Sequence, residues 1–170
     1  MVDGKTEHWY FTLLKRMEHD KLQNVKLNPS LPKRTHLEDQ FDWVLEMAMT
    51  HDKVFWLIDL DVLKREERME KAGSIWGSKA LSFQKRYDNV QVCINTPCLE
   101  YWFLLHFEET KKYYSQCEDA TRALRRHLLT YEKTQKYFFH NSPNLYEVLR
   151  QSLPSALKRA SGLTVFDVSK

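Results

Sequence analysis

The stretch that decides the fold is VFWLIDLD, which runs from Val54 to Asp61. Its first five residues are apolar and follow no 3.6-residue period, which is typical of a strand buried on both faces of a parallel sheet. The stretch contains two carboxylates, Asp59 and Asp61, and alternate residues of an extended chain point the same way. Both would then face one point beyond the carboxyl end of the strand, where open α/β sheets bind ligands. Oxygen ligands suit Mg²⁺ or Mn²⁺, although a solvated acidic turn fits the same residues equally well.

Three further segments are expected to pair with this strand. VQVCIN (90–95) is a second apolar run, NVKL (24–27) is a shorter one, and Met1 and Val2 precede the turn DGKTE. Helix-periodic segments separate them, which predicts an α/β fold with a mostly parallel sheet of about four strands. A first strand of two residues is too short to hold a sheet together. We therefore expect the first strand to be short or missing, with the chain beginning upstream of Met1 or another element filling that place.

The segment after the last apolar run is the second landmark. LEYWFLLHFEE begins after Pro97 and is apolar nearly all round, which predicts a buried helix. Glu100 at its start is either stabilised by the helix N-terminus or directed into the site at the strand ends. The remaining residues show only helical periodicity. The chain is therefore predicted to be one domain, residues 1–170, with an α/β core (1–108) and a helical extension (109–170).

Composition limits the classes of protein to consider. The hydrophobic content of 42% and charged content of 29% are ordinary for a globular protein. Four glycines make a glycine-rich phosphate loop improbable. No apolar run approaches the ~18 residues of a membrane helix, and the N-terminal stretch has no signal-peptide core, so we expect a cytoplasmic protein. A net charge of +3 does not by itself indicate a nucleic-acid-binding protein.

The three cysteines, Cys93, Cys98 and Cys117, have neither CxxC spacing nor an even count. Reduced thiols are therefore expected, rather than a disulfide framework or a zinc knuckle. A cysteine hydrolase is a further hypothesis, because Cys98 lies at a helix N-terminus, where a thiol pKa falls. His106 is two helical turns away, roughly 12 Å along the axis, which is too far for a direct pair. His106 is more typical of a core histidine.

Five segments together resemble the RloB-like proteins, whose fold is similar to the Toprim domain. They are DGKTEHWYF, VFWLIDLD, INTPCLEYWFLLHFEE, the tripeptide YEK (131–133) and ALKRASGL (156–163). The resemblance implies a Toprim-like, Rossmann-like core in which acidic residues after the first and third strands hold a divalent metal. Asp59 and Asp61 match the Asp-x-Asp of that core, and Glu7 matches an acidic residue of the first turn. Asp3 stands where the family usually has glutamate.

The resemblance also implies a function. RloB-like proteins are regarded as metal-dependent nucleases of bacterial anti-phage defence, often beside an ATPase partner from the same locus. The expected substrate is DNA or RNA, tRNA included, the expected cofactor is Mg²⁺ or Mn²⁺, and a homo-oligomer is compatible with this role. The residues predicted to hold the metal or to act in catalysis are Asp3, Glu7, Asp59 and Asp61, with Glu100 as an added metal ligand.

A second group of residues is predicted to bind nucleic acid. Spacings of three and four residues place three arginines on one helix face, although a solvated face is the plainer interpretation of each one. Two lysines are expected to hold phosphate as point charges. The full set is Lys5, Lys133, Arg122, Arg125 and Arg126.

A different class of function stays open. Aspartate is one methylene shorter than glutamate, and a displacement of ~1 Å can cost on the order of 100-fold in rate. With Asp3 and a short first strand, the chain would be a catalytically degenerate Toprim-like subunit that docks a defence ATPase. Metal binding at the acidic cluster separates the two hypotheses.

Overall fold

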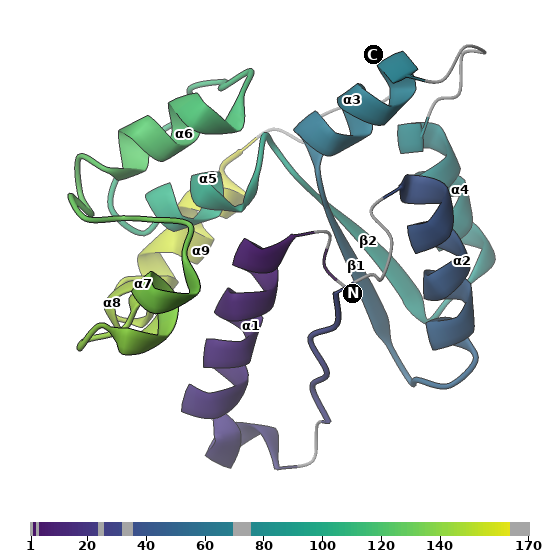
Figure 1. Ribbon diagram of the computed structural model, residues 1–170, viewed down its shortest axis with the longest axis horizontal. Coiled ribbons are helices and arrows are strands. Elements are labelled where there is room, and N and C mark those ends of the chain that lie inside the picture. The colour runs from purple at the N-terminus through teal and green to yellow at the C-terminus, as the bar shows by residue number, and fades with distance from the viewer. Residues whose placement is uncertain (1, 3, 24–25, 32–35, 70–75, 164–170) are drawn as a thin grey trace.

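The computed structural model describes residues 2, 4–23, 26–31, 36–69 and 76–163. Strands and helices alternate in the first half, and the second half is helical (Figure 1). The elements are α1 (Lys5–Met17), the 3₁₀ helix η1 (His19–Leu22), α2 (Leu37–Ala48), β1 (Val54–Asp59), α3 (Leu60–Met69), α4 (Trp76–Arg86), β2 (Val90–Asn95), α5 (Leu99–Leu104), α6 (Cys117–Leu124), α7 (Gln135–His140), α8 (Leu145–Arg150) and α9 (Leu153–Ser161).

The sheet of the described residues has two strands, not the four that the sequence predicted. β1 and β2 pair in parallel, with Val54 opposite Val90 and Asp59 opposite Asn95. The parallel α/β class is confirmed, and the Toprim-like topology stays a prediction. β2 has its predicted bounds, and β1 begins at Val54 as predicted but ends at Asp59, two residues before the end of the predicted extended stretch.

The other edge of β1 explains the difference in strand number. Val2 forms a single parallel bridge to Leu57, and its backbone N–H donates to the carbonyl of Ser30 at 3.1 Å. The expected strand at 24–27 is not formed by residues 26 and 27, and residues 24 and 25 lie outside the described residues. The runs before Gly4 and Pro29 supply too few consecutive residues for a ladder.

One hydrophobic core joins the sheet to α2, α3 and α4. Trp56 and Ile58 of β1 are fully buried, against Val44 of α2 and Phe83 of α4. The indole N–H of Trp56 donates to the side-chain oxygen of buried Gln40 at 3.2 Å. The bond pairs the indole N–H with the amide oxygen, so neither of these buried groups lacks a hydrogen-bond partner.

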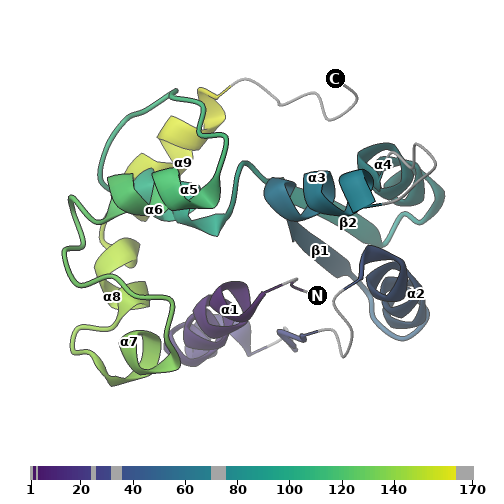
Figure 2. The same ribbon diagram turned by 45° about the horizontal axis from the view of Figure 1, so that its top comes forward.

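A second core joins α1 to the helical extension. Tyr10 of α1 packs with Phe103, Tyr131, Phe138 and Leu149. Figure 2 shows α5–α9 on the opposite side of the strands from α2 and α4, with α1 beside the strands. Residues 109–163 contain helices and no strand, as predicted. No helix among the described residues is long and apolar enough to cross a membrane.

His106 belongs to this helical half and gives stability a pH dependence. It is buried, as predicted, and its Nδ1 lies 3.0 Å from the carbonyl oxygen of Trp102. Burial lowers the pKa of its imidazole from the ordinary value of 6.5. As pH falls below 6.5, the unfolded chain binds a proton at this histidine that the folded chain does not bind. The free energy of unfolding therefore decreases.

We therefore expect the free energy of unfolding of the parent to decrease when the pH is lowered from about 7.5 to about 5.5. The decrease should be smaller in His106→Asn. Urea titrations at both pH values measure the difference. The control His19→Asn changes an exposed histidine and should follow the parent. Equal losses in the parent and His106→Asn would contradict the assignment.

Candidate metal centre

The first turns of several helices bring carboxylates to the end of the sheet. Glu7, Asp61, Glu100 and Glu118 lie in the first turns of α1, α3, α5 and α6. Helix N-termini carry partial positive charge and stabilise negative groups. Figure 1 shows that α3 follows β1 at the end of the sheet where β2 leads toward α5 and α6. The backbone N–H of Leu60 donates to the carbonyl of Pro97 at 3.0 Å, which ties these two exits together.

Asp59 and Asp61 are held by different elements. Asp59 is the last residue of β1, and its Oδ1 accepts a hydrogen bond of 3.0 Å from the side-chain amide of Asn95. Asp61 belongs to α3, so the strand stops before it and the predicted extended geometry from Asp59 to Asp61 is wrong. Leu60 has begun the helix because the charged segment after it favours helix over strand. Asn95, opposite Asp59 in the register, was missed by the sequence analysis.

The electrostatics of Asp61 favour a cation beside it. Burial raises the pKa of its carboxyl, with a further rise from Glu118. The backbone N–H of Val62 and the positive charges of Lys133 and Arg65 act in the opposite direction. A half-buried carboxylate whose ionised form is disfavoured gains free energy when a metal ion neutralises it. The effect of Lys133 on the pKa of Asp61 indicates that its ammonium lies near this carboxylate.

Glu100 is buried at 1% exposure and is held by two residues of the YEK tripeptide. Its Oε1 accepts a hydrogen bond of 2.7 Å from the hydroxyl of Tyr131 and lies 2.9 Å from Nζ of Lys133. Burial raises the pKa of the Tyr131 phenol, and the charge of Glu100 adds to the rise, so Tyr131 stays protonated and donates. Lys133 thus pairs directly with Glu100 and also lowers the pKa of Asp61 through its charge. The sequence analysis named Lys133 for phosphate binding, and it gave no role to Tyr131.

Glu7 lies on the same side of the molecule, in the first turn of α1. It is 2% exposed, and its charge also raises the pKa of Tyr131. Gly4 is the N-cap of α1, and a Cβ built on it would collide with Oε2 of Glu7. Gly4 therefore leaves the room in which the buried carboxylate lies.

Gly4→Ala should displace the carboxylate of Glu7 and weaken Mn²⁺ binding by about 10-fold, as changes around metal ligands commonly do. Calorimetric titration with Mn²⁺ measures this. Gly162→Ala is the matched control, because a Cβ there meets only ordinary contacts, with 3.5 Å to the nearest atom. An unchanged affinity in Gly4→Ala would remove Glu7 from the ligand set.

The cysteines differ from the prediction. Cys98 and Cys117 form a disulfide that joins the N-cap of α5 to the first residue of α6, so the expectation of reduced thiols is wrong for this pair. Cys93 is free, as expected. The two cysteines are 19 positions apart in the sequence, and the packing of α5 on α6 brings them together. No spacing rule could have found them.

The three arginines do not form one open face. Arg125 donates to the carbonyl of Tyr131 at 3.0 Å, which fixes the chain just before Lys133. Arg122 lies 3.3 Å from a carboxylate oxygen of Asp119, and Arg126 lies 3.3 Å from one of Glu108. Arg122 and Arg126 nevertheless line one open pocket of about 390 Å³, together with Lys112, Tyr113, Tyr114, Ser115, Asp119 and Ala123.

Two predicted residues lie at the start of the chain. Lys5 is the exposed first residue of α1. Asp3 lies outside the described residues, so the prediction that it holds a metal stays a prediction. The predicted acidic residues that the structure describes, Glu7, Asp59, Asp61 and Glu100, and Lys133 come from four separate segments of the chain. Among the described residues, Glu7, Asp59 and Asp61 are not gathered into one metal-ligand group.

Comparison with known proteins identifies the family of the chain. The sequence model of the family described as "RloB-like protein" matches residues 1–168. Comparison with curated proteins and with solved structures gave no match. The match covers every segment on which the resemblance was based, including both acidic motifs and the YEK tripeptide.

Proposed function

Because the chain belongs to the RloB-like family, we propose that it is a divalent-metal-dependent nuclease that hydrolyses phosphodiester bonds of DNA or RNA, tRNA included. The observation that carries the proposal is Lys133, whose ammonium pairs with buried Glu100 at 2.9 Å and also acts on Asp61. A lysine that is paired with a fully buried carboxylate and lies near a half-buried one combines a phosphate-binding group with a metal-binding group. Metal-dependent hydrolysis of a phosphodiester bond uses both.

The proposed ligands of Mg²⁺ or Mn²⁺ are Glu7, Asp59 and Asp61, with Asp3 as a further candidate. Carboxylate oxygens are the ligands that such an ion prefers, and burial disfavours the bare charge on Asp61. Among the described residues these three carboxylates are not gathered into one ligand group, so the proposal requires the metal to draw them together. When bound, the metal would polarise the phosphate and make an attacking water more acidic. Oε1 of Glu100 is already occupied by Tyr131 and Lys133. We therefore assign Glu100 to positioning Lys133 rather than to holding this metal.

The basic residues supply the substrate contacts in this proposal. Lys133, whose side chain is 43% exposed, can reach a phosphate while Glu100 fixes its position. Its charge would stabilise the negative charge that develops on the phosphate oxygens. Lys5, Arg122 and Arg126 are exposed and would contact the nucleic-acid backbone, which gives salt-dependent binding without sequence preference. Arg125 is assigned to holding the backbone at Tyr131.

The biological setting rests on the family. We place the nuclease in bacterial anti-phage defence, with an ATPase of the same locus as its partner. The second candidate is a degenerate subunit that only docks that ATPase. It is favoured by the narrow sheet, in which a single bridge at Val2 stands where a first strand would position the acidic turn.

An incubation of the purified chain with end-labelled single-stranded DNA, duplex DNA and tRNA tests the proposal. We expect cleavage of at least one substrate with Mg²⁺ or Mn²⁺ and none with a chelator. The Asp59→Asn/Asp61→Asn variant should be inactive, which excludes a contaminating nuclease. Cleavage that persists in this variant or in chelator would refute the proposal. Metal binding without cleavage, with and without the ATPase, would favour the degenerate subunit.

A further inference from the structure

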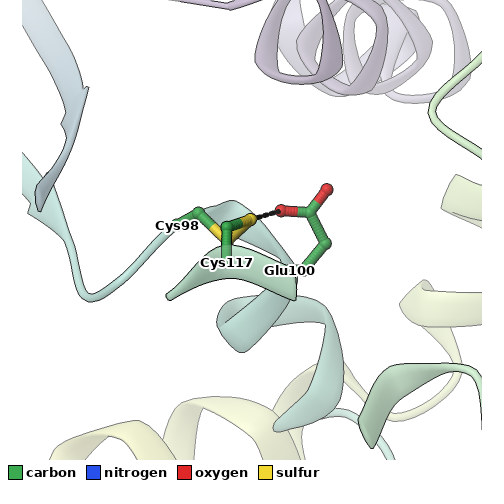
Figure 3. A group of neighbouring side chains, drawn as sticks. All are labelled: Cys98, Glu100 and Cys117. Atoms are coloured by element: carbon green, nitrogen blue, oxygen red, sulfur yellow. Dashed lines mark hydrogen bonds between the residues drawn. A yellow bond between two sulfur atoms is a disulfide. The ribbon is translucent and has the colours of Figure 1, made fainter. Parts of the chain in front are cut away.

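A second group of metal-ligating side chains lies beside the proposed nuclease site. Cys98, Glu100 and Cys117 are all buried, and one ligand atom from each lies within 4.8 Å of the others. Figure 3 shows the two sulfur atoms next to the carboxylate of Glu100. Within the described ranges, this is the group of three such residues that could hold a metal ion.

The two oxygens of Glu100 have different surroundings. Oε1 is held by the hydroxyl of Tyr131 and by Nζ of Lys133. Oε2 faces Sγ of Cys117 at 3.1 Å. A sulfur in a disulfide carries no proton and cannot donate, so this contact leaves a buried carboxylate oxygen without a hydrogen. Such an oxygen gains free energy from a proton or a cation placed between it and the sulfur.

Reduction of the disulfide would place a thiol proton beside Oε2, and the thiolates formed from it could bind a cation there. We propose that the reduced form of Cys98 and Cys117, together with Oε2 of Glu100, binds one Zn²⁺. A dithiol reductant gives the disulfide two electrons and two protons, which produces two thiols and leaves the reductant as its own disulfide. Zn²⁺ then displaces the two thiol protons to solvent, and water completes four-coordination.

The surroundings of the group fit this ion. Two thiolates and a carboxylate carry three negative charges, which Zn²⁺ and the ammonium of Lys133 balance. Tyr131 and Lys133 fix Oε1 and so orient Oε2, as partners of metal ligands generally do. Sulfur ligands select Zn²⁺ over Mg²⁺, so this site is distinct from the oxygen site at Asp59 and Asp61. The metal would replace the disulfide as the link between α5 and α6.

Cobalt serves as the probe, because Co²⁺ bound by thiolate gives a charge-transfer absorption and Zn²⁺ outcompetes it at such sites. The chain is reduced with dithiothreitol, desalted without oxygen and titrated with Co²⁺. We expect a thiolate band that saturates at one thiolate-bound Co²⁺ per chain and that Zn²⁺ abolishes, and no band in the oxidised chain. Cys98→Ser and Cys117→Ser should lose the band. Glu100→Gln, which keeps the size of the side chain, should bind at least about 10-fold more weakly.

Two controls separate this site from the others. Cys93→Ser removes the free cysteine, and Asp61→Asn removes a proposed magnesium ligand, and both should keep the full band. A reduced chain without the band, a band unchanged in Glu100→Gln or Cys117→Ser, or failure of dithiothreitol to expose Cys98 and Cys117 to thiol titration would overturn the proposal. Loss of the band in Asp61→Asn would also overturn it, because the two sites would then be one.

Discussion

Asp61→Asn is expected to abolish metal-dependent cleavage, with a loss on the order of 1,000-fold, or about 4 kcal/mol of transition-state stabilisation. The amide keeps the shape of the side chain but removes the negative charge that would bind the cation. Initial rates of cleavage at saturating Mg²⁺ measure the loss. Asp42→Asn is the matched control, because Asp42 is an exposed carboxylate on α2 and should have no effect. Activity within about 10-fold of the parent would remove Asp61 from the metal site.

The same variant should be more stable than the parent at neutral pH without metal. The pKa of Asp61 in the folded chain is raised above its ordinary value of 3.8. The protonated carboxyl therefore contributes stability below pH 3.8, and this contribution is lost as the pH rises through the folded-state pKa. The asparagine variant escapes this loss, and its advantage should vanish toward pH 3.8. Saturating Mg²⁺ should stabilise the parent and leave the variant unchanged. Thermal unfolding across pH, with and without Mg²⁺, measures both effects.

Lys133→Met is expected to reduce the free energy of unfolding by about 2–3 kcal/mol and to abolish cleavage. The variant leaves the carboxylate of Glu100 buried without its cation, with Tyr131 as its remaining hydrogen-bond donor. Breaking a fully buried ion pair costs about 3–5 kcal/mol, and the cost is smaller here because Lys133 is partly exposed to solvent. Urea unfolding measures stability, and the cleavage assay measures activity.

A second substitution separates the two effects of Lys133. In Lys133→Met/Glu100→Gln the buried charge is gone, so most of the lost stability should return while activity stays absent. Lys136→Met, an exposed lysine of α7, is the control and should change stability by less than about 0.5 kcal/mol. Recovery of cleavage in the double variant would show that Lys133 serves only to neutralise Glu100. Full stability in Lys133→Met would contradict the ion pair itself.

The parts of the fold that follow from local patterns were predicted from the sequence. The apolar stretch that begins at Val54 and the segment Val90–Asn95 were predicted as strands, and the structure forms both, although the first ends at Asp59 and not at Asp61. The nearly continuous apolar run after Pro97 was predicted as a buried helix, and Leu99, Glu100, Phe103 and Leu104 of α5 are buried. Periodicity also identified the helical character of residues 109–163. In each case, neighbouring residues alone determine the outcome.

The remaining features depend on contacts between distant segments. The number of strands was overestimated, because a short apolar run does not say whether it has a partner to pair with. The disulfide between Cys98 and Cys117 and the bond from Tyr131 to Glu100 depend on how α5, α6 and the loop before α7 pack. Lys133 was proposed for phosphate binding, but its pairing with Glu100 could not be derived from spacing.

The most direct test of the metal centre is a calorimetric titration with Mn²⁺ on the parent chain and on Asp59→Asn/Asp61→Asn. It requires neither the substrate nor the partner. We expect one saturable Mn²⁺ site in the parent that is absent from the double variant. Equal binding by both proteins, or no binding by the parent, would contradict a metal centre at the end of the sheet.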